Sequence, residues 1–274
     1  MVKLFPFNLE FSADNQGRPF FASFPFMFDG VPVEGISCGL SSRFAGDMAY
    51  SVQNPARLAL LKAVGLDPVR VYGLTQIHSR QVLAVDRQRP PDIPADGMVS
   101  GDRQISLSIT AADCLPVYLL DTETGAFGLL HSGWRGTGIA VQALKCMAKH
   151  WGTKPEAIAA VLGPCLDSCC YKVDEERAVA FDQKFGAVLP ELAAKDAALF
   201  KPVTRREERM EGVSWYLDLK AANIRLLAAS GVRNIAVCGD CTFTDERLGS
   251  FRREGREYTR MAALCGRLRV LDVF

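Results

Sequence analysis

The chain has few histidines, no long apolar run and almost no net charge. Only three histidines occur in 274 residues, which excludes any site built from many imidazoles. Lys and Arg (32) nearly balance Asp and Glu (31), for a net charge of +1. This balance gives no electrostatic reason to expect nucleic acid or an anionic membrane as a partner. No run approaches the roughly 20 apolar residues needed to span a bilayer.

Export signals, internal repeats, low-complexity tracts and linkers are also lacking. The start, MVKLFPFNLEFSADNQG, is interrupted by Pro6, Asn8 and Glu10, unlike the continuous apolar core of a signal peptide. We therefore expect a cytoplasmic protein with one domain over residues 1–274. With 49% hydrophobic and 23% charged residues, the composition is typical of a globular chain that buries a substantial core.

Nine cysteines are numerous for such a chain. In a reducing compartment they are expected to be buried thiols, ligands or nucleophiles rather than disulfides. Cys165, Cys169 and Cys170 in CLDSCC, and Cys238 and Cys241 in CGDC, suggest a zinc finger. No second pair or histidine lies at a finger-like distance, so we expect structural thiols here rather than a second metal.

Capping residues and hydrophobic patterning predict helices alternating irregularly with strands. Helices are expected over residues 54–66, 139–150, 174–186 and 218–231. Strands are expected over residues 105–110, 114–121, 126–131 and 234–239, with another running from residue 71 into a loop at His78. Because a regular βαβ order is missing, we expect an α+β fold with mixed sheets and helices outside.

The segment ITAADCLPVYLLDTETGAFGLLHSGWRGTG, residues 109–138, places a histidine at the end of a strand. If residues 122–125 form a hairpin loop, Pro116 faces His131 across the ladder. Cys114, two residues before Pro116, then points to the same face as a diagonal neighbour of His131. A slip of one residue in the register would separate them.

A cysteine beside a histidine permits two chemistries. A thiolate activated by an imidazole is a nucleophile, whereas a thiolate with two imidazoles is a zinc site with one open position. The second option requires another ligand. His150, inside a helix beside Trp151, is expected to be structural, and His78 in TQIHSRQV is the better candidate. Gln76 lies two residues before His78, on the same face of the expected strand.

The chain after His131 turns through Gly133, Gly136 and Gly138 into a helix. A helix start offers free N–H groups and a positive dipole end, which suit an anion such as phosphate. Arg135 adds a forked cation to this turn. A plain glycine turn is the alternative interpretation.

Six motifs, in this order, resemble those of the laccase-domain proteins, also called multicopper polyphenol oxidases, peptidoglycan editing factors and zinc-dependent purine nucleoside phosphorylases. The motifs are TQIHSRQV, ADGMVSG, TAADCLPV, LLHSGWRGT, GPC…CCYKV and SFRREG. The resemblance runs from about Gly39 to the C-terminus. It implies an αββα layered fold and one metal held by His78, Cys114 and His131.

The resemblance also implies phosphorolysis of adenosine, inosine or methylthioadenosine, deamination of adenosine, and a part in the quality control of cell-wall precursors. Phe251 stands where the family has Tyr, and Thr259 where it has Gly, so the pocket is expected to differ. The laccase name conflicts with the histidine count, because a multicopper oxidase needs several copper ions and many imidazoles.

The sequence thus predicts a zinc enzyme that acts on a purine nucleoside and phosphate. Zn²⁺, rather than copper, is expected at the histidines and cysteine named above, with water or phosphate at its open position. Asp113 is a candidate acid/base group beside Cys114 and His131, or simply a turn residue. The candidates for substrate contacts are Arg135, Gln76, Arg253 and Arg260.

Three alternatives stay open. The first is a metal-free hydrolase that cleaves an amide in a peptidoglycan precursor, with Cys114 as nucleophile and His131 as base. The second is a copper-binding oxidase or electron-transfer protein. The third is a zinc module without activity, in which a fourth protein ligand closes the site.

Overall fold

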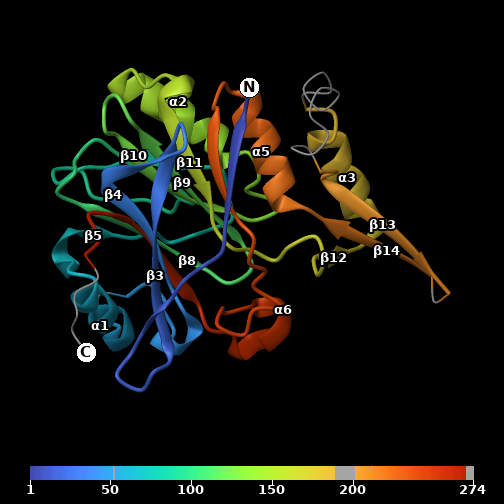
Figure 1. Ribbon diagram of the computed structural model, residues 1–274, viewed down its shortest axis with the longest axis horizontal. Coiled ribbons are helices and arrows are strands. Elements are labelled where there is room, and N and C mark those ends of the chain that lie inside the picture. Colours follow the sequence, from blue (N-terminus) through green and yellow to red (C-terminus); the bar gives the residue numbers. More distant parts are fainter. Residues whose placement is uncertain (52, 189–200, 211, 270–274) are drawn as a thin grey trace.

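A computed structural model of the protein describes residues 1–51, 53–188, 201–210 and 212–269. Two large sheets lie face to face, with helices outside them (Figure 1). The seven-stranded sheet runs in the order β1 (Lys3–Phe7), β15 (Asn234–Cys238), β11 (Ile158–Leu162), β9 (Leu115–Asp121), β10 (Phe127–Ser132), β7 (Gly97–Ser100) and β6 (Val82–Ala84). The six-stranded sheet runs in the order β2 (Ser12–Ala13), β3 (Pro19–Phe28), β4 (Val31–Ser41), β16 (Met261–Gly266), β8 (Ser106–Ala111) and β5 (Val71–Tyr72).

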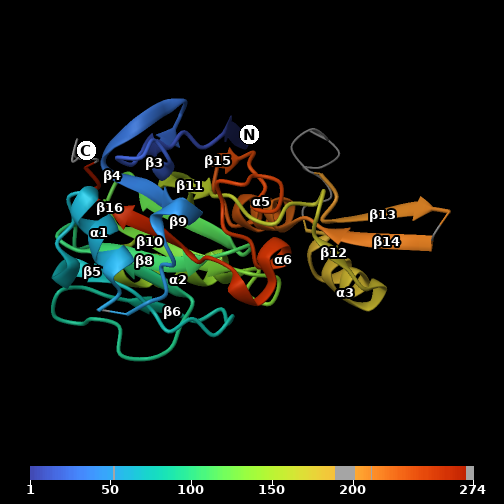
Figure 2. The same cartoon turned by 90° about the horizontal axis from the view of Figure 1, so that it is seen from below.

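Both large sheets mix parallel and antiparallel pairs. A small third sheet has the order β12 (Lys172–Val173), β14 (Gly212–Leu217) and β13 (Thr204–Arg209). Its long strands β13 and β14 project from the body beside α3 (Glu175–Phe185), as Figure 2 shows. The α+β class predicted from the sequence is confirmed.

The four predicted helices are present. They are α1 (Pro55–Ala63), α2 (Ile139–Trp151), α3 and α5 (Leu219–Ala229). The structure adds α6 (Phe251–Glu254) and the 3₁₀ turns η1 (Arg43–Ala45), η2 (Pro68–Arg70), η3 (Pro155–Ala157) and η4 (Gly255–Glu257). Side chains of Asn54, Asp174 and Asp218 accept hydrogen bonds from the first-turn amides, so each is an N-cap. None of the described helices is both long and apolar enough to cross a membrane.

Three apolar layers hold the elements together. Helices α2 and α5 pack on the outer face of the seven-stranded sheet through residues such as Ala143 and Leu227. The two sheets pack on each other around Tyr118, whose buried hydroxyl donates to the Gly39 carbonyl at 2.9 Å. Leu60 and Leu61 of α1 pack on the outer face of the six-stranded sheet. The layers therefore follow the predicted αββα order.

The hairpin of β9 and β10 has the predicted register. Pro116 pairs with His131, and the amide of Asp121 donates to the carbonyl of Ala126 at 2.8 Å. The Asp121 carboxylate accepts hydrogen bonds from the amides of the following loop, and Gly125 closes the loop with a φ of 75°. This register places Cys114 and His131 on one face.

The strand predicted from residue 71 to His78 is mostly wrong, because β5 ends at Tyr72. The following residues find other hydrogen-bond partners. The Gln76 side chain accepts from the Thr110 amide at 2.7 Å and donates to the Thr110 carbonyl at 2.9 Å. The Gln76 amide group therefore takes the place of the backbone of a neighbouring strand at Thr110. The amides of residues 77–79 all donate to the carboxylate of Asp96. The buried Asp96 carboxylate thus binds the amides of a segment that the apolar pattern predicts to be a strand, and these amides are satisfied without a neighbouring strand.

Candidate metal centre

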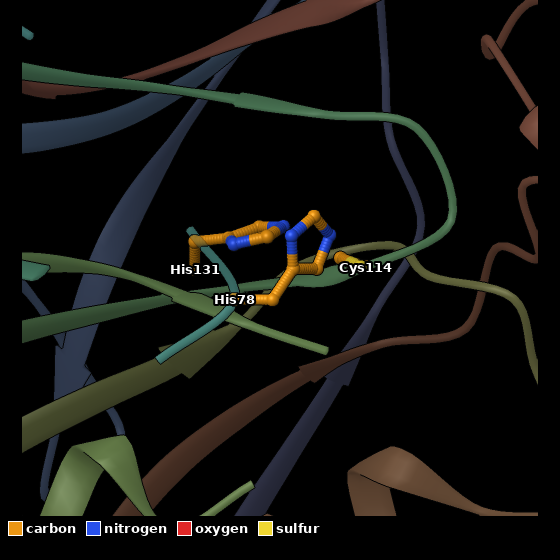
Figure 3. Close-up of side chains that lie close together, drawn as sticks. All are labelled: His78, Cys114 and His131. Carbon is orange, nitrogen blue, oxygen red and sulfur yellow. The ribbon is translucent and has the colours of Figure 1, made fainter. Parts of the chain in front are cut away.

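His78, Cys114 and His131 converge from three separate segments. The ligand atoms of these side chains lie within 4.8 Å of one another. The two imidazole rings stand nearly edge to face, with centroids 4.9 Å apart, and the Cys114 sulfur lies beside them (Figure 3). His131 is buried at the end of β10, Cys114 is partly buried just before β9, and His78 is exposed.

Asp96 orients both histidines, and sequence reasoning assigned it no role. Its Oδ1 lies 2.9 Å from His131 Nδ1 and accepts a hydrogen bond from the His78 amide at 2.9 Å. Its Oδ2 accepts from the amide and hydroxyl of Ser79 at 2.6 and 2.8 Å. The only sequence signal was its place in ADGMVSG, one of the motifs that carry the family resemblance. Carboxylates in this position typically fix the ring orientation of a metal-binding histidine.

One of the ligand residues, His78, and the neighbour of another, Asp113, adopt a backbone conformation that L-residues rarely adopt. His78 has a φ of 58° and Asp113 a φ of 88°. The Asp96 carboxylate stabilises the His78 conformation by accepting hydrogen bonds from the amides of residues 77–79. The conformation of Asp113 is held by its own carboxylate, which accepts from the hydroxyls of Thr242 and Ser250, each at 2.6 Å, and from the Arg252 amide at 2.7 Å. Such local strain persists where surrounding contacts determine it, often at functional sites.

The glycine turn after β10 passes very close to the cluster. A Cβ atom on Gly133 would lie 2.9 Å from the Cys114 sulfur and 3.6 Å from His78 Cδ2. A Cβ on Gly136 would lie 3.0 Å from the Ser79 carbonyl oxygen. At Gly133 and Gly136, glycine therefore serves close packing around the ligands. Gly138, with a φ of 100°, precedes the first turn of α2.

The electrostatics of the cluster favour an ionised sulfur. Burial raises the pKa of Cys114, but the charge of His131 and hydrogen bonds from both histidines lower it to about 7. Burial lowers the pKa of His131, but Cys114 and Asp96 raise it to about 9. Burial likewise raises the pKa of Asp96, and its hydrogen bonds with His131 and Ser79 lower it to about 2. The two histidines and Asp96 thus favour ionisation of the Cys114 thiol, the form in which a cysteine binds a metal.

The residues present fit a single metal ion. Since His131 Nδ1 faces Asp96, its Nε2 is left for a metal. Imidazole nitrogens and thiolate sulfurs are zinc ligands, and three protein ligands with one open position are typical of catalytic zinc. Among the residues that the structure describes, no fourth His, Cys, Asp or Glu joins this group. A four-coordinate ion held by these three residues would therefore keep one position open for water or substrate.

A pocket of about 340 Å³ opens over the cluster. Its floor includes all three ligand residues, and its walls combine aromatic, polar and cationic side chains. The wall residues used below are Tyr50, Gln76, Thr110, Tyr258 and Arg260. The size falls at the lower end of the range for small-molecule sites.

The structure brings only some of the predicted substrate residues to this pocket. Gln76 lines it while holding Thr110, and Arg260 lines it while paired with Asp47 through two hydrogen bonds of 2.9 and 2.7 Å. Arg135 is exposed and lies over the Trp134 ring, 5.2 Å from its centroid. It is not among the residues that line the pocket, so its predicted phosphate contact stays a prediction.

Arg253 and Asp113 are not among the residues that line the pocket, and both make structural contacts. The Arg253 guanidinium donates to the carbonyls of Thr242, Phe243 and Asp245 at 2.7, 3.0 and 3.1 Å. These bonds hold the loop that also contacts Asp113. The Asp113 carboxylate faces the donors of that loop and of α6, which favours a positioning role over the predicted acid/base role.

Known proteins resemble the chain over most of its length. It is 31% identical over 253 residues to a purine nucleoside phosphorylase of Corynebacterium glutamicum, covering 89% of this chain and 93% of the relative. It is 34% identical over 215 residues to a purine nucleoside phosphorylase of Deinococcus radiodurans, covering 78% of this chain and 76% of the relative.

Solved structures share the fold. Hypothetical protein YfiH of Bacillus licheniformis matches with a TM-score of 0.71 and 25% identity, covering 84% of this chain and 92% of that one. YlmD of Geobacillus stearothermophilus matches with a TM-score of 0.66 and 26% identity, covering 89% and 96%. The family model described as "Multi-copper polyphenol oxidoreductase laccase" matches residues 31–267. The chain therefore belongs to this laccase-domain family, as its motifs indicated.

Proposed function

We propose that this protein is a zinc-dependent purine nucleoside phosphorylase in the cytoplasm. Its substrates would be phosphate and adenosine, inosine or methylthioadenosine, with deamination of adenosine as a second reaction. The observation that carries the proposal is a metal-compatible His78–Cys114–His131 cluster at the floor of a nucleoside-sized pocket. The names of the relatives, which the chain covers over most of their length, support the reaction class.

The pocket walls suit the two parts of a nucleoside substrate. Tyr50 and Tyr258 offer aromatic surface for a purine base. Arg260 is the guanidinium among the lining residues, and its bidentate pair with Asp47 fixes its orientation. We assign the phosphate contact to Arg260 ahead of Arg135, because a phosphate oxygen must reach the same pocket as the sugar.

Phosphorolysis breaks the bond between C1′ of the ribose and the base nitrogen, and forms a bond between C1′ and a phosphate oxygen. The base leaves with the proton that the phosphate gives up. The other product is ribose 1-phosphate from adenosine or inosine, and methylthioribose 1-phosphate from methylthioadenosine. A bound zinc ion would supply Lewis-acid stabilisation of negative charge at the pocket floor. The chain itself would orient the ligands through Asp96, hold phosphate through Arg260 and shield the reaction from water through its aromatic walls.

The first test is an assay of inosine with and without phosphate, with hypoxanthine and ribose 1-phosphate as expected products. A chelator should abolish turnover and zinc should restore it. His78→Ala should lose both zinc and turnover. His150→Ala is the matched control, because His150 is an exposed histidine outside the cluster. Base release that is indifferent to phosphate would contradict phosphorolysis, and a metal-free His78→Ala protein with normal turnover would contradict the zinc mechanism.

One geometric observation favours a second candidate, the metal-free amide hydrolase. Asp96, His131 and Cys114 form a chain in which a carboxylate orients an imidazole beside a thiol, as in cysteine hydrolases. The two candidates predict opposite effects of a chelator on Cys114. A zinc-bound thiolate should become reactive to iodoacetamide only after chelation, whereas a nucleophile should react before it. Peptide mapping is required, since Cys169 is also exposed.

A further inference from the structure

A second cluster of sulfurs lies outside the centre described above. The sulfurs of Cys169, Cys170 and Cys241 lie within 4.8 Å of one another. Those of Cys169 and Cys170 are 3.3 Å apart. Cys169 is exposed, Cys170 is partly buried and Cys241 is buried, so the cluster reaches from the surface inward. It shares no residue with the His78, Cys114 and His131 group.

This grouping differs from the one that the sequence suggested. The Cys238–Cys241 spacing is typical of a zinc finger, but Cys238 does not join Cys241. The Cys238 thiol donates to Asp240 Oδ2 at 3.3 Å, and its side chain packs in the core between the sheets. Cys238 and Cys165 are fully buried, as expected for structural thiols. Cys169, Cys170 and Cys241 do not fit that expectation, because their sulfurs group together and the group reaches the surface at Cys169.

The backbone holds the three sulfurs together. Cys165 and Cys241 form a parallel β-bridge, and the Thr242 amide donates to the Cys165 carbonyl at 3.0 Å. The Asp167 amide donates to the Cys241 sulfur at 3.4 Å. These contacts fix the segment around Cys241 against the loop that carries the other two cysteines. The arrangement therefore needs no bound ion to bring the sulfurs into range, and pre-organised ligands favour binding.

The carboxylate of Asp167, whose amide contacts Cys241, is already hydrogen-bonded. Asp167 Oδ2 accepts from Lys220 Nζ at 2.9 Å, and its Oδ1 accepts from the Ser168 amide at 2.9 Å. Within the described part of the chain, the cluster gains no histidine, carboxylate or fourth cysteine. It is a ligand set of three sulfurs. Soft thiolates favour Cu⁺, Zn²⁺ and iron–sulfur clusters. A structural zinc site normally has a fourth protein ligand, and [2Fe–2S] and [4Fe–4S] clusters normally have four cysteines, so a set of three sulfurs favours Cu⁺ among these.

We propose that Cys169, Cys170 and Cys241 form a second metal site that takes a thiophilic ion of the Cu⁺ type. On binding, each thiol exchanges its S–H bond for a sulfur–metal bond, and the released protons go to solvent. A bound ion would tie the loop of residues 167–170 to residues 240–242. Because Thr242 also holds Asp113 next to Cys114, this second site would brace one wall of the proposed zinc centre.

The test uses the full chain without its first centre, as the double variant His78→Ala/Cys114→Ser. The reduced protein is stripped of metal and titrated anaerobically with Cu⁺ against a chromophoric Cu⁺ chelator. We expect one Cu⁺ per chain, and X-ray absorption should show sulfur neighbours only. Cys169→Ser in this background should weaken Cu⁺ binding by at least about tenfold, since even outer-sphere changes at metal sites cost 10–100-fold.

Two further variants make the test specific. Cys169→Ser alters an exposed side chain, so the fold should survive, and Cys241→Ser should give the same loss if it folds. Cys146→Ser is the matched control, because Cys146 is a partly buried cysteine on α2 outside the cluster, and it should leave Cu⁺ affinity unchanged.

Three outcomes would overturn the proposal. The first is no stoichiometric Cu⁺ binding in the double variant. The second is equal affinity in Cys169→Ser and its parent. The third is a disulfide between Cys241 and Cys169 or Cys170 that persists in a glutathione buffer of cytosolic poise, which would make the cluster a redox site. None of these depends on nucleoside turnover, so they are independent of the proposed phosphorylase activity.

Discussion

Replacing Asp96 by Asn should weaken zinc binding although Asp96 is not itself a ligand. The carboxylate accepts five hydrogen bonds, from the amides of Ile77, His78 and Ser79, the Ser79 hydroxyl and His131 Nδ1. An Asn side chain keeps one acceptor oxygen and turns the other into a donor. Either the contacts of Oδ1 with both histidine segments or those of Oδ2 with residues 77 and 79 must therefore be lost.

The magnitude follows from these lost contacts. Loss of an oriented outer partner typically costs about 10–100-fold in metal affinity, which corresponds to about 1.4–2.7 kcal/mol. Hydrogen bonds to charged groups contribute about 1.5–3 kcal/mol each. Because contacts in one network are not additive, we expect a loss of about 3 kcal/mol in the free energy of unfolding.

Asp121→Asn is the matched control for this experiment. Asp121 is also buried and accepts from two amides and a hydroxyl of its own loop, but it lies at the opposite end of β9 from Cys114. It should lose stability and keep its zinc affinity. Zinc competition with a chromophoric chelator and denaturant unfolding measure the two quantities. An Asp96→Asn protein with wild-type zinc affinity, or an equal loss of affinity in Asp121→Asn, would refute the role given to Asp96.

Three further predictions test other parts of the molecule. Gly133→Ala should weaken zinc binding by at least about tenfold, because its Cβ would lie 2.9 Å from the Cys114 sulfur. Unchanged zinc affinity in the chelator competition would show that the backbone of the turn can move to make room for the Cβ. Arg260→Lys should raise the phosphate KM by about 10–100-fold, since a fork-shaped donor to phosphate is worth about 1.5–3 kcal/mol. Steady-state kinetics of Arg260→Lys and Arg135→Lys, measured side by side, show which arginine contacts phosphate. A raised phosphate KM in Arg135→Lys alone would assign the contact to Arg135. Burial raises the pKa of Asp121, but hydrogen bonds from the Thr124 hydroxyl and from the amides of Thr124 and Glu123 lower it below its ordinary value overall. Asp121 therefore stabilises the fold above the pKa of about 3.9 that it has when unfolded, and this contribution is lost as the pH falls through its folded pKa. Unfolding curves between about pH 5 and 2 should be less pH-dependent in Asp121→Asn, and identical slopes would contradict this.

Local sequence determined the starts of three helices, the β9–β10 hairpin and half of the metal centre. The caps Asn54, Asp174 and Asp218 act on amides within three residues, so helix starts could be predicted from neighbours alone. The four-residue loop of the β9–β10 hairpin likewise sets its register, and the register places Cys114 beside His131. These are short-range effects, in which each residue meets partners that are near it in the chain.

Only the tertiary structure decided how the rest of the centre is built. His78 was a candidate from its polar surroundings, but its position depends on Asp96, which captures the amides of residues 77–79 from a distant segment. Periodicity predicted a strand there because it registers side-chain polarity and not a remote acceptor for backbone amides. The same limit applies to Arg260 with Asp47 in the pocket wall and to Cys241 beside Cys169. Such contacts form only when the packed sheets bring separate segments together, since hydrogen bonds and metal ligation act over a few ångströms in space and not along the chain.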